Sequence, residues 1–386
     1  MASRESLLLA KLLESQRQSP KQRLTFAEFM SVVLYDAEAG YYGSGQVTIG
    51  AQGDFFTSSS LGSDFGELLA AQFAEMWNRL AQPPTFTVVE IGAGTGLFAR
   101  DVLKWVQQNS PIFAKSLDYV IVDTSPALCV RQAETLSAQP VRWSHWSEIP
   151  NNSLVGCVFA NEVVDALPVH RVVMNGGKLQ EIFVQLTAPR RFEEMQGQLT
   201  AKVQEHLAVC KLEFNPQNYA ANYRTEINCA IADWLKTIAN KLAQGWLLTI
   251  DYGYESKRYY APTRSEGTLQ CYLHHQRHSN PYINLGEQDI TAHVDFTALQ
   301  RWGEKAGLQT LGFTRQALFL MALGLGERLE KLRTQGLDLQ TTLRRRDALH
   351  QWLDPAGLGN FGVLLQGKNL PEATQLLTGF TTPLIS

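Results

Sequence analysis

Short apolar runs alternate with helical patterns of apolar residues through the middle of this 386-residue chain. The apolar runs predict strands at 86–91, 118–123, 140–143, 155–160 and 246–250, and the segments between them predict helices at 96–108, 126–137 and 226–243. Strands that alternate with helices indicate a doubly wound α/β fold, a mostly parallel sheet with helices on both faces. Ligands of such sheets bind at the carboxyl ends of the strands.

The two ends of the chain differ from this alternating core. Residues 1–36 predict two helices, and the second begins with a capping box in which Thr25 is the N-cap and Glu28 lies three residues later. A third helix is expected at 64–80. The tail is polar, and its basic run at 344–346 indicates a solvated helical face.

An insertion interrupts the core, where strand-like runs flank the hairpin turn Asn175-Gly176-Gly177. We therefore expect three parts, which are N-terminal helices and active-site loops over 1–82, a core over 83–325 with an insertion at about 171–225, and a C-terminal helical extension over 326–386.

Charge and composition narrow the classes of partner. The formal net charge of −3 argues against nucleic acid as the main partner, which needs a basic face. The five cysteines lack C-x-x-C spacing and suit free thiols in a reducing compartment. No apolar run reaches the roughly twenty residues that span a bilayer, and the N-terminus lacks a signal-peptide pattern. We expect a cytoplasmic protein in a bacterium or a mitochondrial matrix protein in a eukaryote, and a homodimer stays open.

The strongest chemical signal is the segment 87–96, in which an apolar strand brings Glu90 into a loop with glycines at alternate positions, Gly92, Gly94 and Gly96. Without β-carbons a ligand can lie against the loop, and the N–H groups that open the next helix are free to bind it. Residues 94–99 fit the G-x-G-x-x-G/A pattern, so the glycines alone leave NAD or FAD open.

The acid beside the glycines suggests a different ligand. The E-x-G-x-G-x-G arrangement resembles motif I of class I methyltransferases that use S-adenosylmethionine, whose ammonium and sulfonium suit a nearby carboxylate. Asp123 ends the next strand, where an acid can accept both ribose hydroxyls of an adenosine. The alternative is that Asp123 caps the helix near residue 126, a role that Ser125 can also fill.

A pair of carboxylates follows the fourth strand. Glu162 and Asp165 are three residues apart and would lie on one side of a helical turn facing the ligand crevice. Together they could hold a guanidinium, which gives paired hydrogen bonds to carboxylates, and take its proton. The alternative for Asp165 is that it braces the loop.

Histidines mark two further segments. His293 could act as a base near neutral pH, although such a residue more often forms a structural hydrogen bond. Cys271, His274, His275 and His278 have the density of a metal site, but their surroundings indicate a loop without a second ligand pair, so we expect no metal.

Several segments together resemble the MidA-type protein arginine methyltransferases, a family that includes a mitochondrial complex I assembly factor. The resemblance spans about residues 24–325 and is carried by 35–42, 53–57, 65–66, 90–94, 161–168, 250–253 and 289–296. It implies a class I methyltransferase fold with a substrate-covering lobe, S-adenosylmethionine as cofactor and an arginine of a respiratory-complex subunit as acceptor. By this resemblance Glu90 and the three glycines hold the methionine part, Asp123 the ribose, and the Asn161-Glu162 loop faces the methyl group.

The expected site residues fall into three groups. The catalytic group is Glu162, Asp165 and Asn161. The cofactor group is Glu90, Gly92, Gly94, Gly96, Asp123, Ser125, Asn161, Gly53 and Asp54. The substrate group is Tyr41, Tyr42, Phe55, Asp251, Tyr252 and His293. Two other functions stay open, an NAD- or FAD-dependent oxidoreductase and an assembly chaperone that binds its partner without methylating it.

Overall fold

A seven-stranded mixed sheet forms the centre of the computed structural model, which describes residues 3–45, 58–273, 276–332, 336, 338–372 and 376–381. Its strands, in spatial order, are β16 (Gln309–Arg315), β17 (Gly362–Lys368), β10 (Leu242–Asp251), β5 (Leu154–Asn161), β2 (Phe86–Ile91), β3 (Leu117–Val122) and β4 (Val141–Trp143). The last five strands run parallel to one another, whereas β17 is antiparallel to both of its neighbours. The expected doubly wound α/β fold is confirmed.

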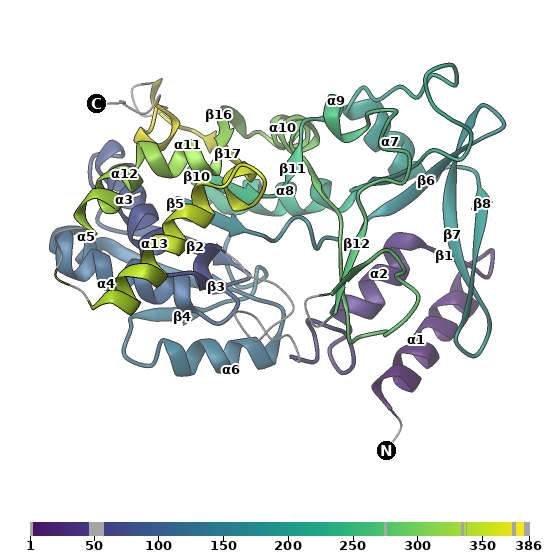
Figure 1. Ribbon diagram of the computed structural model, residues 1–386, viewed down its shortest axis with the longest axis horizontal. Helices are drawn as coiled ribbons and strands as arrows, with labels where there is room; N and C mark the ends of the chain where they lie inside the picture. The colour runs from purple at the N-terminus through teal and green to yellow at the C-terminus, as the bar shows by residue number, and fades with distance from the viewer. Residues whose placement is uncertain are drawn as a thin grey trace.

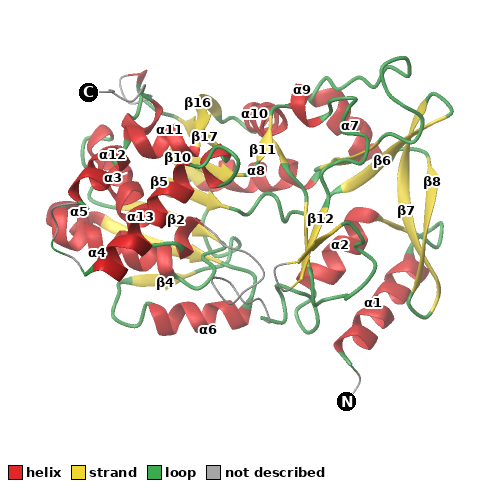
Figure 2. Ribbon diagram, in the orientation of Figure 1, coloured by secondary structure: helices red, strands yellow, loops and turns green. Residues whose placement is uncertain are grey.

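Helices cover both faces of this sheet (Figure 2). On one face lie α3 (Ser63–Arg79), α4 (Leu97–Asn109), α5 (Pro111–Ser116), α11 (Gln316–Ala322), α12 (Leu325–Lys331) and α13 (Leu339–Leu353), and on the other lie α8 (Ala230–Lys241) and α10 (Phe296–Lys305). The helix α6 (Pro126–Thr135) connects β3 to β4. The central strand β2 is buried along its whole length, which explains its nearly continuous apolar run.

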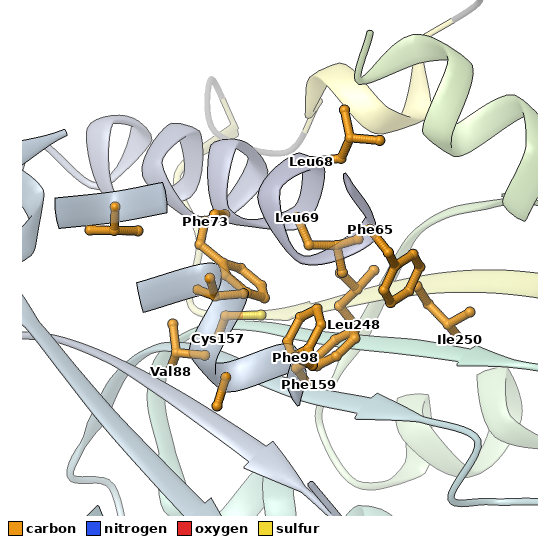
Figure 3. Packing of buried hydrophobic residues seen from close by; sticks show 14 of the residues in the cluster. Phe65, Leu68, Leu69, Phe73, Val88, Phe98, Cys157, Phe159, Leu248 and Ile250 are labelled. Atoms are coloured by element: carbon orange, nitrogen blue, oxygen red, sulfur yellow. The ribbon is translucent and has the colours of Figure 1, made fainter. Parts of the chain in front are cut away.

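Aromatic side chains fill the core between α3 and the sheet (Figure 3). Phe65 and Phe73 project from α3 toward Phe98 of α4 and Phe159 of β5, and the rings of Phe98 and Phe159 stack with centroids 4.6 Å apart. This packing fixes α4, the helix that follows the glycine loop, against α3 and β5.

The N-terminal helices pack on a second, antiparallel sheet at the end of the molecule remote from α3–α5 (Figure 1). The helices are α1 (Arg4–Gln18) and α2 (Phe26–Tyr35), and the predicted capping box of Thr25 and Glu28 is present. The sheet contains β1 (Leu24–Thr25), β6 (His170–Asn175), β7 (Lys178–Ala188), β8 (Arg191–Gly197) and β9 (Arg224–Ile227), with α7 (Ala201–Val209) after β8. The predicted hairpin turn at Gly176 and Gly177 joins β6 to β7.

Short elements complete the fold. They are α9 (Ser256–Tyr259), β11 (Gly253–Tyr254), β12 (Gln270–Leu273), β13 (Gln276–His278), β14 (Asp289–Thr291), β15 (Val294–Asp295) and the 3₁₀ turns Ser58–Ser60, Leu358–Asn360 and Thr378–Phe380. Cys271 and His278 are paired across the β12–β13 hairpin, while His274 and His275 lie outside the described residues. Among the residues that the structure describes, no group of three His, Cys, Asp or Glu could hold a metal ion.

The C-terminal part of the chain is not only helical. Residues 362–368 form β17 inside the central sheet, which the expected helical extension did not include. Within the basic run on α13, Arg344 and Arg346 are exposed as expected. Arg345 instead pairs with the buried Asp64 of α3 at 2.6 Å, and Arg328 binds the same carboxylate. Within the ranges given above, no helix is long and apolar enough to cross a membrane.

Candidate active site

A cavity of about 780 Å³ opens at the carboxyl ends of β2, β3, β5 and β10. One side, which we call the glycine side, is lined by Glu90, Gly92, Ala93, Gly94 and Asp123. A second group of lining residues, which we call the tyrosine side, comprises Tyr35, Tyr42, Tyr252, Tyr254 and Tyr272. Asn161, Glu162 and Asp165 also line the cavity. The topology therefore brings most of the predicted site residues together.

The loop after β2 explains its alternating glycines. Gly92, Gly94 and Gly96 have φ values of +64°, +54° and +82°, in the left-handed region that side chains with a β-carbon disfavour. Gly96 is the N-cap of α4, so the unpaired N–H groups of the first helical turn lie at the end of the loop. Gly96 shapes the loop but does not itself line the cavity.

Two carboxylates stand on the glycine side. Glu90 accepts a hydrogen bond of 2.8 Å from the Tyr119 hydroxyl, and burial raises the pKa of Glu90 to about 8. Asp123 accepts bonds from the Ser125 N–H at 2.9 Å and from Gln132 Nε2 at 2.8 Å, and burial raises its pKa as well. A cation that enters the cavity would stabilise the charged form of both acids.

Ser125 has a structural position. Its hydroxyl caps α6 by accepting from the Leu128 N–H at 3.4 Å, and it lies outside the cavity lining. The helix-capping alternative for Asp123 is therefore wrong, because Ser125 fills that role. The expected contact of Ser125 with the cofactor does not fit this placement either.

Gln132 is a site residue that the sequence did not reveal. Its Nε2 donates both to the Gly94 carbonyl at 3.0 Å and to Asp123, while its Oε1 accepts from Trp143 Nε1 at 2.8 Å. This fully buried amide thus ties the glycine loop to the acid that ends β3. A single glutamine on an amphipathic helix carries no sequence signal for such a role.

The turn after β5 is not helical, contrary to our expectation. Glu162 has a φ of +54°, and its N–H donates to the Ile250 carbonyl at 2.9 Å. One carboxylate oxygen, Oε1, accepts from the Ser58 N–H at 3.2 Å and from Asn161 Nδ2 at 3.1 Å. Burial and the neighbouring Asp165 raise the pKa of Glu162 to about 8.

Asp165 holds one occupied and one unoccupied acceptor. Its Oδ2 accepts from the Tyr252 hydroxyl at 2.5 Å, whereas its buried Oδ1 has no hydrogen-bond partner among the described residues. The same is true of the buried Asn161 Oδ1. Burial raises the pKa of Asp165 to about 6. Two buried acceptors that line one cavity without donors indicate a ligand that is rich in N–H groups.

Asp251 does not face the cavity. It is fully buried, and both of its carboxylate oxygens accept backbone N–H groups, including those of Val163, Val164 and Asp165. The expected contact of Asp251 with substrate therefore does not fit the structure.

The two adjacent tyrosines after α2, Tyr41 and Tyr42, lie in different surroundings. Tyr41 is 2% exposed and packs in the core, so the expected substrate contact does not fit it. Tyr42 lines the cavity, stacks on Tyr35 with centroids 5.5 Å apart and donates to Asp289 at 2.8 Å. The Tyr35 hydroxyl donates to the Ala166 carbonyl at 2.8 Å. Because their hydroxyls bond to the protein, these tyrosines present mainly aromatic surface to a ligand.

His293 also lines the cavity, where it stacks on Tyr254 with centroids 5.3 Å apart. Burial lowers the pKa of His293 to about 4, so the imidazole is neutral near pH 7. Its buried Nδ1 has no partner within the described part of the chain. The expected Gly53, Asp54 and Phe55 lie outside the described residues.

The C-terminal segment supplies lining residues that sequence analysis missed. They are Gln351, Ala356, Gly357, Leu358, Asn360 and Phe361. Trp352 Nε1 donates to the Ser58 carbonyl at 3.2 Å, and Gln316 Nε2 donates to the Leu358 carbonyl at 3.0 Å. These bonds hold the segment against the rest of the site.

Comparison with known proteins gives a consistent result. A family model described as "Putative S-adenosyl-L-methionine-dependent methyltransferase" matches residues 68–314. The protein arginine methyltransferase NDUFAF7 homolog of Drosophila melanogaster is 27% identical over 86% of this chain and 78% of its own length. The Mus musculus protein arginine methyltransferase NDUFAF7 is 28% identical over 91% of this chain and 83% of its own length. Both relatives are named as mitochondrial.

A solved structure agrees over nearly the whole fold. A Burkholderia thailandensis protein described as a "likely methyl transferase" and bound to S-adenosyl-homocysteine superimposes with a TM-score of 0.83 and 30% identity, covering 98% of this chain and 95% of the other. These similarities overturn the alternative that the chain is an NAD- or FAD-dependent oxidoreductase. The chain belongs to this family of S-adenosylmethionine-dependent methyltransferases, together with the NDUFAF7 (MidA-type) proteins.

Proposed function

We propose that this enzyme methylates an arginine side chain of a protein. The observation that carries the proposal is the unpaired, buried Oδ1 of Asp165 beside the Glu162 carboxyl group. A guanidinium is planar, has five N–H donors and has no acceptor, so it matches two neighbouring carboxylates. A lysine ammonium offers only a point charge, and an uncharged acceptor would leave the buried acids unpaired.

The glycine side suits the cofactor. Glu90, Gly92 and Gly94 would hold its methionine part, Asp123 would accept the ribose hydroxyls, and the unpaired Asn161 Oδ1 can accept from an ammonium. S-adenosylmethionine supplies an electrophilic methyl group on a sulfonium. The left-handed glycines let the main chain come close to this group, and the described residues named for this side carry no positive side chain to repel it.

The Asn161–Asp165 turn carries the chemistry. Asp165 and Glu162 would orient the guanidinium so that one nitrogen faces the methyl group that the cofactor would supply. When this nitrogen is methylated, Glu162 would take the proton that the nitrogen loses. A carboxyl group whose pKa is raised to about 8 is suited to this step, because a general base is most effective when its pKa lies near the working pH. The tyrosine side excludes water and offers aromatic surface to the cation.

The acceptor protein is proposed by resemblance. The fly and mouse relatives are named protein arginine methyltransferases. We propose that the acceptor is a subunit of an NADH-dehydrogenase-type complex, encountered in the bacterial cytoplasm or, in a eukaryote, in the mitochondrial matrix. A chaperone role without methylation would leave the carboxylate pair unexplained.

Transfer of an isotope-labelled methyl group tests the proposal. The purified enzyme and labelled S-adenosylmethionine are incubated with membrane complexes from cells that lack the protein, and mass spectrometry then locates the label. We expect label on arginine nitrogens of a complex subunit and none with Glu162→Gln. Label on lysine or only on small molecules would contradict the arginine proposal. Normal assembly of the complex in cells that carry Glu162→Gln, without detectable methylation, would support the chaperone role instead.

A further inference from the structure

The last residue of β10, Asp251, sits behind the carboxylate pair and is completely buried. Its Oδ2 accepts three consecutive backbone N–H groups, those of Val163 at 3.2 Å, Val164 at 3.0 Å and Asp165 at 3.2 Å. Its Oδ1 accepts the Tyr252 N–H at 2.8 Å. Four main-chain donors therefore converge on one side chain, with three of them on a single oxygen.

The turn from 162 to 165 depends on this arrangement. These residues belong to no helix or strand, so their N–H groups have no partners in a regular ladder. A buried N–H without a partner costs free energy comparable to a lost hydrogen bond. For three successive N–H groups to point at one oxygen, the backbone must curl, and the left-handed φ of Glu162 begins that curl. The Glu162 N–H is bonded to the Ile250 carbonyl beside Asp251.

We infer that Asp251 is a positioning residue, whose carboxylate sets the shape of the turn that presents Glu162 and Asp165 to the acceptor. The inference deepens the proposed function, because the turn matters for catalysis only if its carboxylates hold the acceptor. Asp251 acts on Asp165 from two directions. It binds the Asp165 N–H directly, and it fixes the main chain of Tyr252, whose hydroxyl binds Asp165 Oδ2.

The chain contains a matched control in Asp295. This aspartate is also buried, ends the short strand β15 and binds backbone N–H groups, those of Thr297 at 3.0 Å and Ala298 at 3.2 Å, together with the Ser256 hydroxyl. It caps α10 and lies outside the cavity lining. Substitution of either aspartate removes a buried main-chain acceptor, but only Asp251 touches the carboxylate turn.

The test compares Asp251→Asn with Asp295→Asn. The isosteric amide keeps one acceptor oxygen but places an NH₂ group against backbone donors. For Asp251→Asn we expect kcat/KM for the protein acceptor to fall about 100-fold, because misplacement by about 1 Å costs roughly this factor. We expect the Kd for S-adenosylhomocysteine, measured by calorimetry, to stay unchanged. Asp295→Asn should lower the unfolding temperature but leave kcat/KM for the protein acceptor unchanged.

Amide hydrogen exchange on the wild-type enzyme tests the geometry without any variant and without an acceptor. The N–H groups of 163–165 should exchange as slowly as those of β5, although they lie in a loop. In Asp251→Asn they should exchange at least ten times faster, with β5 unchanged. Fast exchange of 163–165 in the wild type, or equal losses of turnover in both variants, would overturn the inference. Slow exchange without arginine methylation would leave the role of Asp251 in the turn intact and reject the proposed function.

Discussion

The glycine side and the tyrosine side of the cavity are built from the chain in different ways. The glycine side comes from the ends of two strands that follow each other in the chain, Glu90 to Gly94 at the end of β2 and Asp123 after β3, with Gln132 of α6 bonded to Asp123. The tyrosine side is assembled from segments remote in sequence, around Tyr42, Tyr252 and Tyr272. A site built locally is encoded by spacing, whereas a site built from distant segments is encoded by the whole fold. We therefore expect a variant on the glycine side to change cofactor binding, and a variant of the carboxylate pair Glu162 and Asp165 to change acceptor turnover.

The largest separation is expected for Glu162→Gln. An amide cannot take the proton or pair with the guanidinium charge, so kcat should fall by about 10³-fold, the upper range for loss of one electrostatic group in an active site. Affinity for S-adenosylhomocysteine should be unchanged, as calorimetry can measure. A parallel loss of affinity would place Glu162 among the cofactor contacts and weaken the division between the two sides.

Asp123→Ala should give the reverse pattern. Removal of the carboxylate loses charged hydrogen bonds worth about 1.5–3 kcal/mol, so the Kd for S-adenosylhomocysteine should rise about 10- to 100-fold. At saturating cofactor the KM for the acceptor should not change. If steady-state kinetics showed the acceptor KM rising by the same factor, the two sides would be coupled.

The pH dependence should also distinguish the sides. The pKa of Glu162 is raised to about 8, so the charged carboxylate that binds the guanidinium forms only as the pH approaches 8. Below pH 8, kcat/KM should therefore rise about tenfold per pH unit. The acceptor arginine stays charged throughout. The rise should disappear in Glu162→Gln, although that variant turns over slowly.

Stability should move in the opposite direction over the same range. An acid with a raised pKa keeps its proton in the fold but loses it in the unfolded chain, so its contribution to stability falls as the pH rises from about 4.5 to about 8. The lowered pKa of His293 acts in the opposite direction only up to about pH 6.5, so the fall is expected between about 6.5 and about 8. Glu90 and Glu162 both contribute to this fall. Thermal unfolding of the ligand-free enzyme at several pH values between about 6.5 and about 8 measures this fall, and stability that rose over that range would contradict the raised pKa values of the two acids.

The smallest effect is expected at the anchor of the C-terminal segment. Arg345→Ala removes one of the two arginines on Asp64 and should lower the free energy of unfolding by about 1–3 kcal/mol. The exposed neighbour Arg344 provides the control, because Arg344→Ala should change the free energy of unfolding by less than about 0.5 kcal/mol. Denaturant unfolding measures both. Equal effects would mean that the ion pair does not hold α13 on α3.

Local patterns predicted much of the fold. The strands β2, β3, β5 and β10 and the helices between them have their predicted positions to within a few residues, because apolar runs and helical spacing are set by burial. The strand β17 was missed. Its residues are a short apolar run after a helix, and only pairing with β10 and β16 makes them a central strand.

The functional site, like the fold, was predicted only where local sequence determines the structure. The glycine loop was recognisable because left-handed backbone demands glycine at fixed positions. Asp123 and Asp251 both sit at the carboxyl ends of parallel strands and gave the same signal, yet only Asp123 lines the cavity. The difference arises because the turn after β5 folds over Asp251, a tertiary event that strand position does not encode. Tyr41 and Tyr42 likewise differ only in the direction that the fold gives each ring.

The place of β17 bears on how the molecule is made. The match to the family model ends at residue 314, and β17 lies beyond this boundary. Nevertheless β17 forms a ladder with residues Gly245 to Asp251 of β10, which lie inside the matched region. On the ribosome, residues 362–368 emerge after every other strand of the sheet. Until then β16 has no strand between it and β10, and one edge of β10 exposes main-chain groups that invite aggregation. The end of the matched family model is therefore not the end of a foldable unit, and a shortened polypeptide that ends at 325 should not be expected to form the cavity.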